Sequence, residues 1–162
     1  MARNLSSPPP PTTETAEGGF ARSAALVIGG LFLVVGVLGF IPGPTIGYDT
    51  MQFAGHHTDA RLLGLFEVSV LHNIVHLLLG VAGLVLSRTV TTARLYLFGG
   101  AAVYLVLWAY GLIIDANSAA NFVPLNRADN FLHLGLAVLM ALLGWIGGRP
   151  GRQERTAEEG ER

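Results

Sequence analysis

The chain has 162 residues, of which 51% are hydrophobic and 13% are charged; its mean hydropathy is +0.52 and its formal net charge is −1. This composition is too apolar for an ordinary soluble domain and indicates an integral membrane protein. The absence of cysteine excludes disulfides, thiolate metal sites and cysteine nucleophiles. The sequence also contains no nucleotide-binding loop, hydrolase elbow or nucleic-acid-binding patch.

Four apolar runs are long enough to form membrane-spanning helices. A helix rises about 1.5 Å per residue, so each run can cross a hydrocarbon core roughly 30 Å thick. Because lipid offers no hydrogen bonds to the backbone, we predict an all-α, four-helix transmembrane bundle. The predicted helices cover about residues 22–41, 62–86, 94–114 and 126–147.

The predicted membrane domain, residues 21–148, lies between two polar segments. Residues 1–20 are rich in proline, serine and threonine, and residues 149–162 are rich in arginine, glutamate and glycine. Neither segment can bury enough apolar surface to fold, so both are predicted to be disordered tails.

The arginines predict the orientation of the chain. Eight of them flank the cytoplasmic side of the bundle if both termini are cytoplasmic, and only two lie on the opposite side. By the positive-inside rule, both termini are predicted to be cytoplasmic. The first group is Arg3, Arg22, Arg88, Arg94, Arg149, Arg152, Arg155 and Arg162, and the second is Arg61 and Arg127. Ten arginines without a lysine, with abundant alanine and glycine, are typical of a high-GC bacterium, so we predict a multi-pass protein of a bacterial plasma membrane.

The pattern [His/Asp]-Asn-x-x-His-Leu occurs twice, at His72–Leu77 and at Asp129–Leu134, 57 residues apart. The preceding helices give a weaker match between Ile28–Gly30 and Phe98–Gly100, 70 residues apart. We interpret the chain as two repeated helical hairpins, related by a pseudo-twofold axis along the membrane normal. Equivalent residues should then lie at the same depth in the membrane.

Polar side chains of this pattern follow one side of the second and the fourth predicted helix, because they are three or four residues apart. A polar or ionisable group that faces lipid costs several kcal/mol, so both stripes should face the interior of the bundle. The predicted intramembrane cluster consists of Ser69, His72, Asn73, His76, Asn126, Asp129, Asn130 and His133.

One interpretation of this cluster is structural. Asn73 and Asn130 would donate and accept hydrogen bonds, neutral His76 and His133 would bridge helices, and Asp129 would accept from a histidine or cap the fourth helix. Such pairs contribute about 0.5–2 kcal/mol each in membranes. This interpretation predicts a non-enzymatic membrane protein whose cluster fixes helix packing or supports a role as an accessory subunit.

The other interpretation is a cofactor site in a redox or proton-linked protein. His76 and His133 could bind the iron of a b-type haem axially, with Gly80 and Gly135 leaving room for the porphyrin. Three imidazoles and a carboxylate are also a donor set that zinc accepts. Because histidine titrates near neutral pH, a proton-linked or quinone-type site is a third form. The candidate haem or metal ligands are His72, His76, His133 and Asp129.

Glu67 lies about 140° around the predicted second helix from His72, so it is predicted to be an acid at the outer interface. Arg61 or Arg127 could pair with it there. The first predicted helix carries a seam of small residues that favours close packing inside the bundle over a homodimer face. This seam includes Ala25, Gly29, Gly36 and Gly39. The lipid bilayer is the predicted partner, and a homo-oligomer or an accessory membrane partner stays open.

Three segments together resemble one known family. They are Gly64–Leu77 followed by Gly80-Val81-Ala82-Gly83, the stretch Ala120–His133, and Gly39-Phe40-Ile41-Pro42-Gly43. They are similar to the signatures of a bacterial, mainly actinobacterial, four-helix membrane family catalogued as domain of unknown function 4383. The resemblance covers residues 21–148. It implies four helices and residence in a membrane, and it implies no activity.

Overall fold

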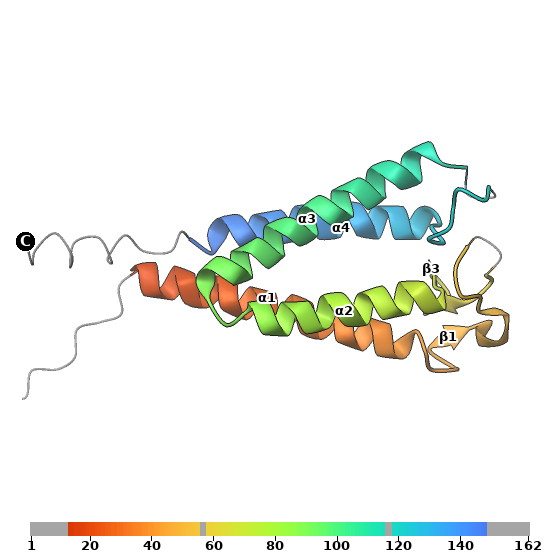
Figure 1. Cartoon of the computed structure of the whole chain (residues 1–162), viewed down its shortest axis with the longest axis horizontal. Coiled ribbons are helices and arrows are strands. Elements are labelled where there is room, and N and C mark those ends of the chain that lie inside the picture. The colour runs from red at the N-terminus through yellow and green to blue at the C-terminus, as the bar shows by residue number, and fades with distance from the viewer. Residues whose placement is uncertain (1–12, 56–57, 116–117, 149–162) are drawn as a thin grey trace, which may run out of the picture.

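The computed structural model describes residues 13–55, 58–115 and 118–148 (Figure 1). The described residues form four helices in two hairpins, since α1 packs along α2 and α3 packs along α4. Figure 1 shows the two hairpins close together at the α2–α3 connection and spread apart toward the opposite end. The helices are α1 (Thr13–Leu38), α2 (Val70–Leu86), α3 (Val90–Ile113) and α4 (Arg127–Ile146).

Three of the helices begin at polar side chains that cap their first backbone amides. The hydroxyl of Ser69 accepts from the amide of His72 at 3.1 Å, and Thr89 accepts from Thr92 at 3.2 Å at the start of α3. Asn126 is the N-cap of α4 and forms a capping box: its side chain accepts from the amide of Asp129, and the side chain of Asp129 accepts from the amide of Asn126. Each cap satisfies donors that a helix start leaves without partners, which fixes where these helices begin.

A small antiparallel sheet, with the order β1-β2-β3, covers the end of the first hairpin. Its strands are β1 (Thr45–Ile46), β2 (Arg61–Leu62) and β3 (Phe66–Glu67), and the 3-10 helix η1 (Tyr48–Thr50) follows β1. The turn between β2 and β3 places Leu63 and Gly64 at φ 55° and 72°. We call this end of the molecule the sheet end.

The sheet corrects the predicted start of the second helix. That helix begins at Val70 rather than at residue 62, because the segment before it pairs in β2 and β3 and turns with two positive φ angles. The third helix begins at Val90 rather than at residue 94. The first begins at Thr13, so residues 13–20 of the predicted tail are helical; residues 1–12 and 149–162 lie outside the described residues.

Among the described residues, three helices are long and apolar enough to cross a membrane: Gly19–Leu38 of α1, and all of α3 and α4. The fourth, α2, is apolar but has 17 residues, or roughly 26 Å of helix, slightly less than a typical hydrocarbon core. The lengths and the exposed apolar side chains of these helices suggest a membrane protein with a mostly helical fold.

The small-residue seam of α1 faces α2, so the prediction of internal packing is confirmed. A Cβ added at Gly29 would lie 2.9 Å from the carbonyl oxygen of Gly80 and 3.0 Å from the Cα of Gly83. Further along α1, a Cβ at Gly36 would meet the side chain of Leu77 at 2.9 Å. Side chains would keep these two backbones apart, so glycine sets the distance between α1 and α2.

Replacing Gly29 by alanine should therefore lower the free energy of unfolding by about 1–3 kcal/mol, because backbone atoms of α2 must move. The adjacent Gly30→Ala is the matched control, since no atom lies within 4 Å of its added Cβ. That variant should be neutral or more stable by up to about 1 kcal/mol. Unfolding of both variants in mild detergent measures the difference; equal stabilities would contradict the packing of α1 on α2.

Candidate functional site

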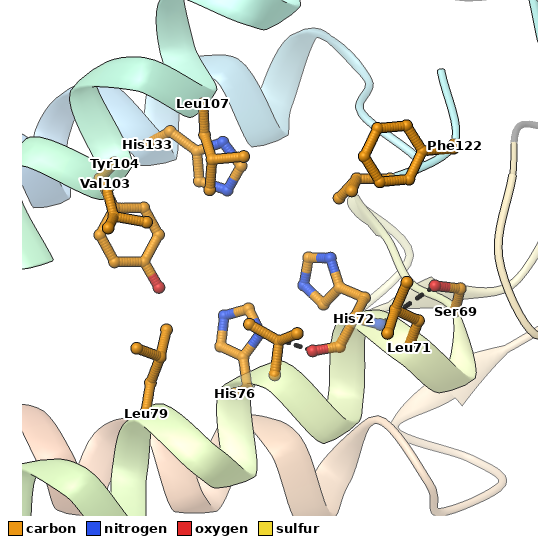
Figure 2. A pocket seen from close by; sticks show the side chains of 12 residues that line it. Ser69, Leu71, His72, His76, Leu79, Val103, Tyr104, Leu107, Phe122 and His133 are labelled. Carbon is orange, nitrogen blue, oxygen red and sulfur yellow. Dashed lines mark hydrogen bonds between the residues drawn. The ribbon is translucent and has the colours of Figure 1, made fainter. Parts of the chain in front are cut away.

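A cavity of about 270 Å³ lies between the two hairpins and is bounded by α2, α3, α4 and the loop before α4 (Figure 2). Its walls are apolar apart from three imidazoles, one phenol and one hydroxyl. The lining residues are Ser69, Leu71, His72, Val75, His76, Leu79, Val103, Tyr104, Leu107, Phe122, Val123 and His133. Four residues of the predicted cluster thus share one space.

His72 and His76 occupy successive turns of α2 and stack face to face, with ring centroids 4.4 Å apart and planes inclined by 19°. Nδ1 of His76 lies 3.0 Å from the carbonyl oxygen of His72. A carbonyl oxygen can only accept, so this bond assigns the hydrogen to Nδ1 and leaves Nε2 of the neutral ring with a free lone pair. His76 can therefore accept a hydrogen bond or a proton at Nε2.

The aromatic rings of Phe32 and Tyr104 connect the histidines of the two hairpins. Phe32 of α1 contacts His76 edge to face, at 5.6 Å between centroids. Tyr104 of α3 contacts His133 at 5.3 Å, and the two aromatic rings are themselves 5.6 Å apart. These spacings are those of favourable aromatic pairs. The packed rings therefore help to hold the imidazoles of His76 and His133 in place.

Two buried polar atoms beside the cavity have no hydrogen-bond partner among the described residues: the hydroxyl of Tyr104 and Nδ1 of His133. The side chains are 1% and 3% exposed. Figure 2 shows His133 on one side of the cavity, His72 and His76 on the other, and the Tyr104 hydroxyl directed into the space between them. An unpaired buried polar group costs about 1–3 kcal/mol, so each one needs an explanation.

The two asparagines of the predicted cluster lie elsewhere. Asn73 packs against Gly39, which directly follows α1, and Asn130 packs against Gly111 of α3, so closely that a Cβ on either glycine would collide with the amide. Each asparagine thus belongs to its own hairpin. The carbonyl oxygens of both amides lack hydrogen-bond partners among the described residues, so they do not link the two hairpins.

Asp129 caps the fourth helix, which confirms one of its two predicted roles. Its Oδ2 accepts from the amide of Asn126 at 3.0 Å and from the amide of Glu67 at 3.1 Å. The side-chain amide of Asn126 donates to the carbonyl oxygen of Leu65 at 2.8 Å. These bonds join the hairpins at the sheet end, and they hold Asp129 outside the cavity lining.

The predicted zinc set does not assemble. The described residues contain no group of three or more histidine, aspartate or glutamate side chains that could hold a metal ion. The carboxylate of Asp129 is occupied by backbone amides instead, because α4 begins at Arg127 and makes Asp129 the residue that completes the capping box.

A b-type haem does not fit the cavity either. A cavity of about 150 Å³ holds one benzene ring, so 270 Å³ holds a substituted ring and falls far short of a four-ring macrocycle. The prediction that Gly80 and Gly135 leave room for a porphyrin is wrong. Gly80 faces Leu33 of α1, with 2.6 Å from its added Cβ to the leucine Cγ, and Gly135 is exposed outside the cavity.

Tyr104 was not predicted as part of the site, although its position carries a signal. It lies eight residues after Tyr96, on the face of α3 that also buries Leu97 and Ala101. A tyrosine on a fully buried helical face has a hydroxyl that normally needs a partner. The identity of its neighbours could not be predicted, because it depends on how α3 crosses α1.

Glu67 lies in β3 rather than on the second helix, and its side chain is mostly buried. Arg61 pairs with it at 3.6 Å, which confirms one of the two predicted partners. Burial raises the pKa of the Glu67 carboxyl, the Arg61 guanidinium opposes this rise, and the nearby Asp59 adds to it.

A family model described as Domain of unknown function (DUF4383) matches residues 22–146, more than half of the chain. None of the curated proteins and none of the solved structures matches the chain. The comparisons therefore contribute a family and no biochemical role.

Replacing Arg61 or Asp59, the charged neighbours of Glu67, should shift the pKa of Glu67 in opposite directions. Arg61→Gln should raise the pKa of Glu67 further, because it removes a nearby positive charge that lowers it, whereas Asp59→Asn should lower it. Infrared titration of the carboxyl band, assigned by its loss in Glu67→Gln, measures both shifts. Shifts of the same sign in the two variants would contradict this arrangement of charges.

Proposed function

This chain belongs to the DUF4383 family, a domain of unknown function, and we propose that it is a membrane protein that binds a small ring-shaped ligand between its two hairpins. The ligand carries hydrogen-bonding groups that pair with the histidines and with Tyr104. The role is proton-linked or redox-linked, because neutral imidazoles that line a cavity can exchange protons with what they bind.

The observation that carries this proposal is the unpaired Tyr104 hydroxyl beside a cavity that three histidines line. If the cluster served only to join helices, its histidines should bond across the bundle. His76 bonds instead to its own helix, and Nδ1 of His133 has no partner among the described residues. A ligand would supply the partners that these groups lack.

The donor and acceptor pattern restricts the ligand. Tyr104 can donate a hydrogen bond, and His76 offers an acceptor at Nε2 because its Nδ1 hydrogen is used within α2. The remaining walls are aliphatic and aromatic, which favours a flat apolar ring between polar ends. The volume of about 270 Å³ accommodates one substituted ring.

The other interpretation, in which the cluster fixes helix packing, applies to the polar residues that do not line the cavity. Asn73 and Asn130 support packing within their hairpins, and Asp129 supports the contact between the hairpins at the sheet end. We therefore divide the predicted cluster into residues that hold the fold and residues that bind a ligand. The binding group is His72, His76 and His133, together with Tyr104.

We further propose that the two hairpins arose by duplication. Phe32 contacts His76 as Tyr104 contacts His133, and Gly39 packs on Asn73 as Gly111 packs on Asn130. In these pairs, each residue of the first helical region matches one in the third helix 72 positions later. Each residue of the second helix matches one in the fourth helix 57 positions later. An offset of 72 agrees better with the contacts than the offset of 70 that the sequence suggested. With the arginine distribution, this arrangement favours cytoplasmic termini and a plasma-membrane location.

A direct test of the proposal uses trimethylhydroquinone, whose two hydroxyl groups can donate hydrogen bonds, as a one-ring probe on protein in mild detergent without oxygen. Equilibrium dialysis should detect saturable binding of one probe per chain, weakened at least tenfold in His76→Leu because an acceptor inside the cavity is lost. Leu78→Ala is the control, since Leu78 lies on the same helix but not on the cavity. The absence of saturable binding by the unmodified chain would overturn the proposal.

Tyr104→Phe separates the two roles of the cluster. Without ligand, removal of an unpaired buried hydroxyl should raise the free energy of unfolding by about 1 kcal/mol, whereas a structural hydroxyl would lower it on removal. Binding of the same probe should weaken about threefold to tenfold, because one hydrogen bond is lost. Unfolding and dialysis on one preparation give both values; a less stable variant that binds normally would contradict the assignment.

A further inference from the structure

We infer that the ligand of this cavity is a quinone-type molecule with an aliphatic tail, which enters sideways from the lipid between α2 and α3. The inference rests on the proposed function and adds to it a ligand class and a route. The ring would lie among the histidines and Tyr104, and the tail would remain between the two helices, in the bilayer.

The first evidence is a gradient of exposure across the walls of the cavity. Tyr104 and His133 are buried, whereas Val75 of α2, Val103 of α3 and Phe122 of the loop before α4 are 42%, 47% and 56% exposed. Val103 lies in α3, which is long and apolar enough to cross a membrane, and Val75 lies in the shorter apolar helix α2, so both valines would face lipid in a bilayer. One continuous cavity therefore reaches from the buried imidazoles to the lipid-facing side of the bundle.

The second evidence is that the sheet end of the cavity is held together by hydrogen bonds. The amide of Gly55 donates to the carbonyl oxygen of Phe122 at 2.7 Å, which ties the loop over the cavity to the first hairpin. The bonds of Asn126 to Leu65 and of Glu67 to Asp129 join the hairpins beside it. α2 and α3 diverge toward this end (Figure 1), and apolar side chains line their facing sides at the cavity. Among the described residues, hydrogen bonds therefore join the two hairpins at the sheet end, whereas none joins α2 to α3 beside the cavity.

The third evidence is size. A cavity of about 270 Å³ holds a substituted six-membered ring but leaves little space for a long chain. A tail on that ring must therefore leave the cavity, and the exposed valines mark where it would reach the lipid. A molecule that dissolves in the bilayer reaches this mouth by lateral diffusion and avoids transfer through water, which would cost about 0.8 kcal/mol per CH₂ group.

The fourth evidence is the placement of the polar groups. His72 and His76 lie on one side of the cavity and His133 on the other, and Tyr104 directs its hydroxyl between them. The two carbonyl oxygens of a para-quinone lie at opposite ends of one flat ring and accept hydrogen bonds from both sides. The phenol of Tyr104 can donate to the quinone, and the free Nε2 of His76 can accept from the hydroxyl of the reduced form.

The test is photolabelling of the full chain in lipid nanodiscs with a trimethyl-1,4-benzoquinone that bears a decyl tail and a diazirine on the third tail carbon. Fragmentation mass spectrometry locates the labelled residues. Labelling that depends on the ring site is the part that an excess of tail-less trimethyl-1,4-benzoquinone suppresses, and we call it ring-competed labelling. The chain contains no cysteine and no lysine, so covalent addition of the quinone to these side chains does not interfere.

We expect ring-competed labelling at Val75, Leu79 and Val103, and a threefold to tenfold loss of it in Tyr104→Phe, because Tyr104 donates a hydrogen bond to a quinone carbonyl oxygen. Ring-competed labelling at residues 118–126 would overturn lateral entry and leave the proposed function standing, because the ring would still occupy the cavity. If the tail-less ring binds but does not reduce labelling by the tailed probe, the assignment of a tailed quinone to this cavity is overturned. If neither probe binds in a saturable manner, the proposed function fails together with this inference.

Discussion

The cost of a polar group in apolar surroundings is the constraint on which this structure depends. The chain places a histidine and an asparagine at matching positions of two apolar helices, and each has to be accommodated within the protein. Asn73 and Asn130 are accommodated by glycines at or just after the end of the neighbouring helix, which bring the two backbones of a hairpin together. The histidines are gathered around a cavity instead. Polar groups thus specify both the close contacts and the open space of the bundle.

The two hairpins use equivalent positions for different purposes. Ser69 and Asn126 both cap a helix, but the residue three positions later is His72 in one hairpin and Asp129 in the other. The histidine stacks over the cavity, whereas the carboxylate accepts amides from its own helix start and from β3 of the other hairpin. One hairpin contributes most of the imidazoles and the other contributes the clasp at the sheet end. The duplication that we propose would let the two halves of the chain divide ligand binding and assembly between them.

The sequence predicts the features that depend on local patterns. Apolar runs locate the helices, and the spacing of Asn126 and Asp129 indicates a capping box. The late start of α2 could not be predicted, because residues 62–68 are mostly apolar and two-residue strands are too short for a periodic pattern. The sequence also could not predict that Asn73 lies outside the cavity and His76 lines it. This depends on packing, because the side of α2 that carries Asn73 contacts the first hairpin and the adjacent side faces the cavity. Tyr104 joins the site only because α3 crosses beside Phe32.

The hydrogen bond within α2 from His76 to the carbonyl oxygen of His72 has a chemical consequence. Because Nδ1 keeps its hydrogen in both the neutral and the charged ring, gain or loss of a proton occurs at Nε2 alone. The imidazole need not flip, and the helix need not release a bond. The cavity could therefore change its charge while its walls stay in place, so that proton exchange is separated from any movement of the helices.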